Sequence, residues 1–145
     1  MTRINANIPP AHLIDQHLFA EYREMVRVPN VVRKDYAKAL AAISKAPKHY
    51  KLGAGHVVFH YDKLAYLHKR FLALKSELNK RGIANNMSDA MFRGLPEDLY
   101  NDADLTYANA IVMPRILERI SNMSRVTYYG QRITTEQYIN LTLAK

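Results

Sequence analysis

The most constraining feature of this chain is a run of large apolar residues spaced alternately by three and four positions. These residues are Leu64, Leu67, Phe71, Leu74 and Leu78. Such spacing keeps side chains on one face of an α-helix, whose period is 3.6 residues, whereas a strand repeats every two residues. The pattern therefore predicts an amphipathic helix with one buried face, and Gly82 is a suitable residue to end it.

Two further helices are predicted on either side of this one. Apolar residues recur at helical spacing in residues 11–28, and Pro29-Asn30 is expected to interrupt or kink that helix before it resumes as far as Ala42. A third helix is predicted for residues 104–122, with a kink or a later start because Pro114 lies inside it. The sequence thus predicts helices that cover one another's apolar faces.

No pairing of strands is predicted. Residues 50–61 contain a short apolar run, but no convincing partner strand exists elsewhere, so we interpret them as a loop that enters a helix. The sequence therefore predicts an all-α fold: a compact single domain, residues 1–145, of three main helices with long connecting loops. Residues 131–145 are expected to form a C-terminal extension of uncertain order.

The charge balance points to a polyanionic partner. The chain has 21 lysines and arginines against 13 aspartates and glutamates, a net charge of +8, which favours nucleic acid or an acidic membrane surface. No apolar stretch approaches the roughly 20 residues that span a bilayer, and no apolar signal segment is seen, so a cytoplasmic location is expected. The absence of cysteine excludes disulfides, thiolate metal ligands and cysteine nucleophiles.

Thr2 is a candidate nucleophile. It follows the initiator methionine, so removal of Met1 would leave Thr2 with a free α-amine. Such an amine has a pKa of about 7.7–8.0, against about 10.4 for a lysine side chain, so a sizeable minority is unprotonated near neutral pH. Only the neutral amine can attack an electrophilic carbon and form a Schiff base. The alternative is that Thr2 is simply the residue after the initiator.

Glu24 is the candidate carboxylate for such chemistry. An amine that attacks C1′ of a deoxyribose displaces the base and leaves an imine, through a transition state with oxocarbenium character that a nearby carboxylate stabilises. Glu24 would also move protons during imine rearrangement and strand cleavage. By residue type alone, a solvated helical glutamate is the simpler interpretation.

Several arginines are candidate phosphate ligands. Arg23 and Arg27 are four residues apart, which places both on one helix face beside Glu24, and Arg3 lies near the N-terminus. Guanidinium groups match phosphate oxygens and set the position of a protein on a duplex. The alternative is a helix surface with partial glutamate–arginine pairing. Lys69, Arg70, Arg81 and the other basic residues of the leucine-rich helix are either solvated surface or part of a DNA-facing band.

Two histidines and two tyrosines complete the candidates for DNA contact. His56 follows Gly53-Ala54-Gly55, whose glycines permit close backbone approach, but His56 and His17 are equally well explained as structural, hydrogen-bonded histidines. Tyr128 and Tyr129 either stack on bases or pack against the helices. The six histidines show no convincing spacing for a metal, so no metal site is predicted.

A combination of short stretches gives the chain a recognisable likeness. They are Thr2-Arg3-Ile4-Asn5, Asp15-Gln16-His17-Leu18, Ala20-Glu21-Tyr22-Arg23-Glu24 with Arg27, and Leu52-Gly53-Ala54-Gly55-His56-Val57 followed by Phe59 and Tyr61-Asp62-Lys63-Leu64. In these residues the chain resembles the phage pyrimidine-dimer DNA glycosylase (endonuclease V) family. The combination is far more specific than any single motif.

The resemblance implies an all-helical enzyme with two activities: excision of cis-syn cyclobutane pyrimidine dimers and lyase cleavage of the resulting abasic site. It implies the α-amine of Thr2 as nucleophile and Glu24 as catalytic carboxylate. The residues that it implies at the lesion or the DNA are Arg3, Gln16, Arg23 and Arg27. It implies no metal and no organic cofactor, a monomer bound to damaged double-stranded DNA, and a host-cell cytoplasmic location for a viral protein.

Two other functions remain open at this stage. A non-catalytic, basic helical DNA-binding protein would explain the charge and the arginines without needing Thr2 or Glu24. A lyase for another base lesion is the other, because the family's aromatic tail includes a tryptophan and this chain has none. Blocking the N-terminal amine separates the first alternative from the enzyme, and comparing ultraviolet-irradiated with oxidised duplexes separates the second.

Overall fold

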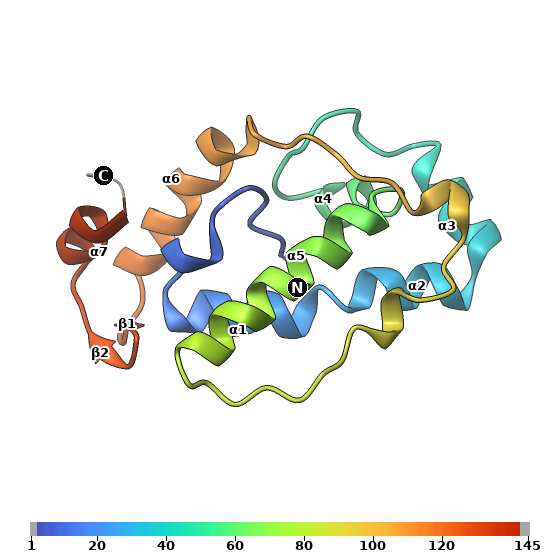
Figure 1. The fold of residues 1–145 in the computed structure, drawn as a ribbon. Coiled ribbons are helices and arrows are strands. Elements are labelled where there is room, and N and C mark those ends of the chain that lie inside the picture. Colours follow the sequence, from blue (N-terminus) through green and yellow to red (C-terminus); the bar gives the residue numbers. More distant parts are fainter. Residues whose placement is uncertain (1–2, 143–145) are drawn as a thin grey trace.

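The computed structural model describes residues 3–142, and these residues are mostly helical (Figure 1). The helices are α1 (Asp15–Glu24), α2 (Arg27–Lys34), α3 (Tyr36–Ile43), α4 (His56–Phe59), α5 (Leu64–Lys80), α6 (Ala108–Ser121) and α7 (Thr135–Thr142), with short 3₁₀ helices η1 (Pro10–His12), η2 (Ala90–Phe92) and η3 (Glu97–Leu99). Strands β1 (Thr127–Tyr128) and β2 (Gln131–Arg132) form an antiparallel pair. A mostly helical fold is therefore confirmed, and the structure adds a two-stranded sheet that the sequence did not predict.

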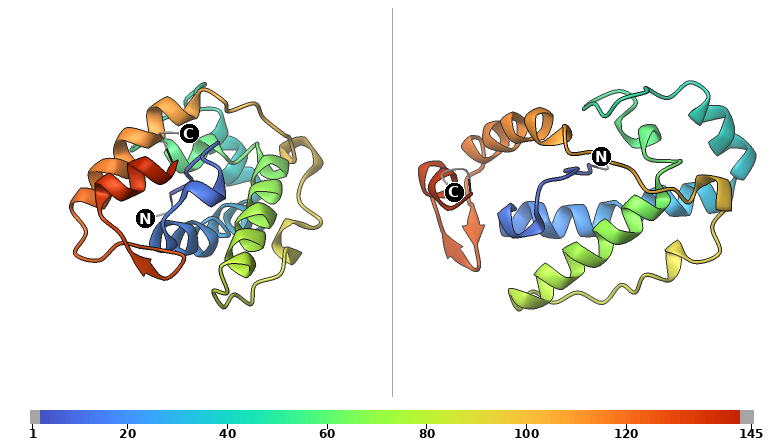
Figure 2. Two further views of the ribbon diagram at one scale, coloured as in Figure 1. Left: turned by 60° about the vertical axis from the view of Figure 1, so that its left-hand side comes forward. Right: turned by 45° about the horizontal axis from the view of Figure 1, so that its top comes forward.

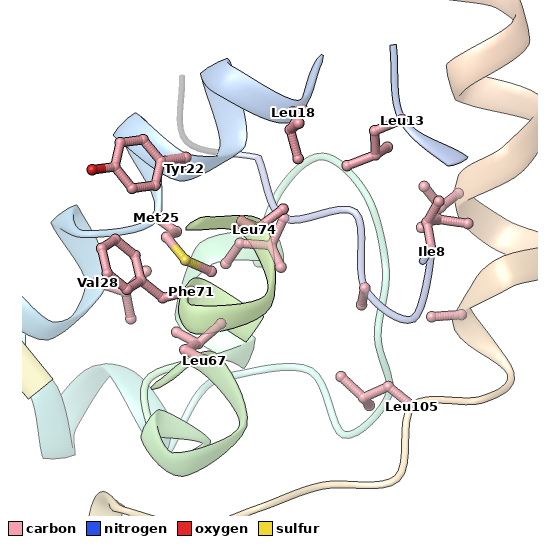
Figure 3. Close-up of a cluster of buried hydrophobic side chains, with 14 of the residues drawn as sticks. Ile8, Leu13, Leu18, Tyr22, Met25, Val28, Leu67, Phe71, Leu74 and Leu105 are labelled. Carbon is pink, nitrogen blue, oxygen red and sulfur yellow. The ribbon is translucent and has the colours of Figure 1, made fainter. Parts of the chain in front are cut away.

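The leucine-rich helix is confirmed as α5 and forms one side of the core. Its five apolar residues are buried, and α1 lies across them, as Figure 3 shows for Leu18 and Tyr22 of α1 and for Met25 just after it. Figure 1 shows α5 crossing in front of α1. Burial of each such side chain contributes about 1.5–3 kcal/mol. The other segments thus pack against the α1–α5 pair.

The end of α5 is the one that Gly82 predicts. Gly82 has a φ of 73°, and the amide of Ile83 donates to the carbonyl of Leu78 at 2.9 Å, as in a helix that ends on a left-handed glycine. At the other end, Lys63 precedes α5 without a side-chain cap and forms an ion pair with Asp62 at 2.9 Å.

The predicted helix of residues 11–28 is divided, and the break lies earlier than expected. Helix α1 ends at Glu24, and α2 begins at Arg27 and contains Pro29 as its third residue. At that position a proline is tolerated, because the first amides of a helix have no partner within it. In one continuous helix, however, the ring of Pro29 would clash with the carbonyl of Met25, so the chain breaks at Met25 and Val26.

The N-terminal segment, residues 3–8, runs through the core rather than over the surface. Ile4, Ala6 and Ile8 are fully buried. Figure 2 shows the segment passing between α1 and α6, with α5 across α1 on the other side. Its backbone has no strand partner among the described residues, so side chains from the surrounding helices must satisfy its polar groups.

The last third of the described chain is a helix, a hairpin and a final helix. Helix α6 begins four residues later than predicted and runs on through Pro114. The hairpin turns at Tyr129 and Gly130, which both have positive φ, as the central residues of a type I′ turn do. Helix α7 follows, and its Tyr138 is fully buried and donates to the carbonyl of His12 at 2.5 Å. The described helices include none that is long and apolar enough to cross a membrane.

Candidate active site

One face of α1 forms the wall of a small pocket. His17, Ala20, Glu21 and Glu24 recur at helical spacing, so they share this face. The pocket has a volume of about 90 Å³ and is closed by two residues of the N-terminal segment and one of α6: Arg3, Asn5 and Arg119. The N-terminal segment, α1 and α6 thus meet at this pocket. Glu24, the last residue of α1, is half-buried there.

The two carboxylates of the pocket, Glu21 and Glu24, differ in their hydrogen-bond and ion-pair partners. Glu21 is buried and bound from both sides, because Arg70 donates to it at 2.5 and 3.0 Å and the side-chain Nδ2 of Asn5 donates at 3.0 Å. Glu24 has no such hydrogen bond or close ion pair with the other described residues that line the pocket, and its charge interacts with that of Arg3. A carboxylate already paired with a buried arginine is poorly suited to stabilise a developing positive charge, so Glu24 is the better candidate of the two for that role.

Positive charge gathers at the mouth of this pocket. Burial lowers the pKa of Arg3 from its usual value, and the nearby cations Arg119 and Arg115 of α6 lower it further. Burial, Arg119 and Arg3 lower the pKa of His17 to about 4, so His17 is neutral at physiological pH. Its Nδ1 is buried and has no hydrogen-bond partner among the described residues. The site attracts anions through arginine while its histidine stays uncharged.

Arg115 and Arg119 were not among the sequence candidates. They are four residues apart on α6, the same spacing as Arg23 and Arg27, so the signal was present in the sequence. Nothing local, however, indicated that α6 packs beside the N-terminal segment.

Arg23 and Arg27 are exposed and do not line this pocket. Arg23 borders a neighbouring groove of about 400 Å³, together with Phe19, Tyr22 and residues 84–87. Its guanidinium carbon lies 5.7 Å from the centre of the Phe19 ring. The structure therefore separates Arg23 from Glu24 although the two are consecutive in the sequence.

Gln16 and the two tail tyrosines form a second cluster, around the hairpin. Gln16 donates to the hydroxyl of Thr127 at 3.0 Å and accepts from its amide at 3.1 Å. Tyr128 donates to the carbonyl of Ala11 at 2.6 Å, and Tyr129 donates to Glu77 at 2.7 Å. The polar groups of all three predicted DNA contacts are thus used here to attach the hairpin.

Asp15 and Arg81 are the centre of that cluster. Asp15 accepts from the amides of Tyr129 and Gly130 at 3.1 and 2.9 Å, which stabilises the positive φ of Tyr129 that a bulky residue rarely adopts. Arg81 pairs with Asp15 and Glu77 at 2.9 and 2.8 Å, and its guanidinium lies 4.7 and 4.6 Å from the two tyrosine rings. The side chains of Arg81 and Arg70 are buried, so a DNA-facing band that includes these two arginines is wrong.

His56 lies apart from the pocket. It is buried at the start of α4, and its Nε2 accepts the amide proton of Ile4 at 3.0 Å. The arrangement is that of a hydrogen-bonded histidine rather than a surface group. The described residues contain no group of three or more histidine, aspartate or glutamate side chains that could hold a metal ion.

Thr2 lies outside the described residues, so its role stays a prediction. Its covalent neighbour Arg3 lines the pocket that also contains Glu24.

A family model described as pyrimidine dimer DNA glycosylase matches residues 1–91. The matched stretch contains the N-terminal segment, α1 and α5, and therefore every lining residue of the pocket except Arg119.

Proposed function

The chain belongs to the pyrimidine dimer DNA glycosylase family, and we propose that it excises cis-syn cyclobutane pyrimidine dimers from duplex DNA and then nicks the abasic site through an imine on the α-amine of Thr2. The observation that carries this proposal is that Arg3 and Glu24 line the same pocket. Consecutive Cα atoms are about 3.8 Å apart, so a terminus one residue beyond Arg3 is within reach of that pocket.

In the first step, the neutral amine attacks C1′ of the damaged nucleotide. The nitrogen–C1′ bond forms while the bond from C1′ to the base breaks, and the base takes the electron pair. The sugar carries oxocarbenium character as this happens, and the carboxylate of Glu24 stabilises that charge. Loss of the amine proton and opening of the sugar, whose O4′ gains a proton, leave an imine between Thr2 and C1′.

In the second step, the imine makes the C2′ proton acidic. A base removes this proton, the electron pair forms a double bond to C3′, and the bond from C3′ to its oxygen breaks, so that the 3′ phosphate leaves and the strand is nicked. Glu24 is the proposed carrier of protons in this step. Water then hydrolyses the imine and returns the free amine for another turnover.

The charged side chains around the pocket would hold the duplex. Arg3 and Arg119 line the pocket, and Arg23 borders the next groove, so phosphates on both sides of a lesion would meet guanidinium groups. His17 stays neutral because burial, and then the nearby cations Arg119 and Arg3, lower its pKa to about 4. Binding of this kind should weaken steeply with salt.

Borohydride trapping tests the proposal, because reduction turns a transient imine into a permanent protein–DNA adduct. We expect the protein with Met1 removed to form adducts on both dimer-containing and abasic duplexes, mapped to the Thr2 amine. Glu24→Gln should lose the adduct on the dimer duplex, and acetylation of the terminus should abolish both while leaving DNA binding. Glu118→Gln, which changes an exposed glutamate on α6, is the matched control and should behave as wild type.

Other outcomes distinguish the alternatives. An adduct on the abasic duplex alone would keep the lyase and remove the dimer as substrate, and oxidised duplexes would then be the next substrates to compare. No adduct on either duplex, with DNA binding intact, would leave a non-catalytic DNA-binding protein.

A further inference from the structure

Both backbone polar groups of Ile4 are bound by side chains from elsewhere in the chain. The amide of Ile4 donates to Nε2 of His56 at 3.0 Å, and its carbonyl accepts from the hydroxyl of Tyr50 at 2.6 Å. The two partners are 52 and 46 residues away in sequence. Ile4 is therefore held from two sides at a point two residues from Thr2.

The protonation state of His56 suits this contact. Its Nδ1 lies 2.9 Å from the carbonyl of Lys51, an acceptor, so Nδ1 carries the proton and Nε2 is left to accept from Ile4. Burial lowers the pKa of His56, which keeps the ring neutral and able to accept. The backbone hydrogen bond to Lys51 thus fixes the tautomer that binds Ile4.

The rings of Tyr50 and His56 are themselves fixed. They are 2% and 5% exposed, and they pack edge to face with centroids 5.3 Å apart. The amide of Tyr50 donates to the hydroxyl of Tyr107 at 2.7 Å. Gly55, directly before His56, has a φ of 87°, and a Cβ there would lie 3.0 Å from Pro47. The glycine-rich stretch therefore serves to bring His56 to this position.

Farther along the segment, other side chains hold the backbone. The amide of Asn7 donates to the hydroxyl of Tyr66 at 3.0 Å, and the carbonyl of Ile8 accepts from Arg70 at 2.7 Å. Those contacts secure the segment in the core whether or not Ile4 is held. Ile4 is closer in sequence to Thr2 than Asn7 and Ile8 are. Because two residues span at most about 7 Å, the contacts at Ile4 restrict the position of the Thr2 amine most directly.

We propose that Tyr50 and His56 are positioning residues, which hold the backbone of Ile4 so that the α-amine of Thr2 is presented to C1′ of the damaged nucleotide beside Glu24. This inference rests on the proposed function. Holding a nucleophile in place raises the rate of the bound complex, and a displacement of about 1 Å costs on the order of 100-fold. Neither side chain needs to touch the DNA.

The test is single-turnover borohydride trapping on an abasic duplex, with the saturating rate and the half-saturating protein concentration measured separately. Tyr50→Phe and His56→Phe should each lower the saturating rate about 10- to 100-fold and leave the half-saturating concentration within about twofold. His56→Gln should recover much of the rate, because an amide oxygen can accept from Ile4. His60→Phe is the matched control: His60 is buried in the same cluster, 5.2 Å from the His56 ring, and its Nδ1 lies 2.8 Å from the carbonyl of His56 rather than binding Ile4.

Amide hydrogen exchange at Ile4 separates positioning from general damage to the fold. Exchange at Ile4 should rise in Tyr50→Phe and His56→Phe while exchange in α5 stays at the wild-type rate. Wild-type trapping rates in both variants would overturn the inference and leave the proposed function standing. Equal losses in His60→Phe with exchange at Ile4 unchanged would also overturn it. A wild-type protein that traps no adduct would overturn the proposed function and this inference with it.

Discussion

The N-terminal segment and the C-terminal hairpin are two irregular pieces of chain mounted on the same α1–α5 pair by different means. The segment is buried, and neutral groups hold much of it: His56, Tyr50 and Tyr66. The hairpin is half-exposed, and its attachment depends on the charged groups Asp15 and Arg81.

The two regions also differ in where they lie. The segment leads to the pocket, lies in the core and falls inside the matched residues 1–91. The hairpin falls outside that match and is hydrogen-bonded to side chains of α1 and α5. The hairpin is thus attached through an ion pair whose arginine side chain is itself buried, whereas the N-terminal segment is held largely by neutral groups.

The largest effect is expected when the buried pair beneath the N-terminal segment is broken. Arg70→Met leaves Glu21 as an unpaired buried carboxylate and removes the donor to Ile8, so the free energy of unfolding should fall by about 3–5 kcal/mol. Lys69→Met is the matched control. Lys69 directly precedes Arg70, its side chain is 71% exposed, and it forms a surface ion pair with Asp102. Urea unfolding measures both, and equal effects would show that the segment is not held as described.

Acid should weaken the two regions in a fixed order. Burial lowers the pKa of His17 to about 4 and of His60 to about 3, so the stability due to their neutral forms is complete above about 6.5 and is lost as the pH falls toward those values. At pH 5, the lowered pKa of each histidine should reduce the free energy of unfolding by about 2 kcal/mol. Asp15, whose pKa is lowered by the amide of Gly130 and by Thr127 and Arg81, loses its contribution only below about 3.8. Hydrogen exchange between pH 7 and 4 should show the N-terminal segment opening before the hairpin.

Removing the charge at the centre of the hairpin cluster should have a smaller, local effect. Asp15→Asn weakens the contacts to Arg81, Thr127 and the turn amides, and we expect a loss of about 1–2 kcal/mol confined to residues 127–142. Hydrogen exchange would detect faster exchange there, with borohydride trapping on an abasic duplex unchanged. A loss of trapping would show that the hairpin also serves the pocket.

The smallest effect is expected in DNA affinity from single surface arginines. Arg119→Met, at the pocket, should weaken duplex binding about 10-fold and reduce the slope of log affinity against log salt by about 1, as for one phosphate contact. Arg132→Met, on the exposed strand β2, is the matched control and should change neither. If Arg132→Met weakened binding and Arg119→Met did not, the DNA would bind on the hairpin side.

Local patterns predicted the features that depend on neighbours in sequence. The spacing of Leu64 to Leu78 predicted α5, and Gly82 predicted its end, because helical period and left-handed glycine are properties of a few consecutive residues. The helical spacing of His17, Glu21 and Glu24 also places them on one face of α1, and all three line the pocket. The break at Met25 could have been predicted from Pro29, since the clash is with the carbonyl four residues earlier.

Other features could not be predicted locally. Arg70 and Arg81 carry the same sequence signal as solvated basic residues, and only the approach of Glu21 and Asp15 from other elements explains their burial. Tyr50 gives no sequence signal of its contact with Ile4. The hairpin has only two residues in each strand, too few for a periodic pattern, and Asp15 is 114 residues away from the turn that it stabilises.

The sequence by itself determined the helical class, the buried face of α5 and the family resemblance through Thr2, Glu24 and the residues around them, because these follow from local spacing and residue type. The tertiary structure decided which of two neighbouring carboxylates is available, since Arg70 neutralises Glu21 and leaves Glu24 facing Arg3 and Arg119. It also decided that the N-terminal segment is held at Ile4. Both depend on contacts between residues far apart in sequence, which form only when the core closes around them.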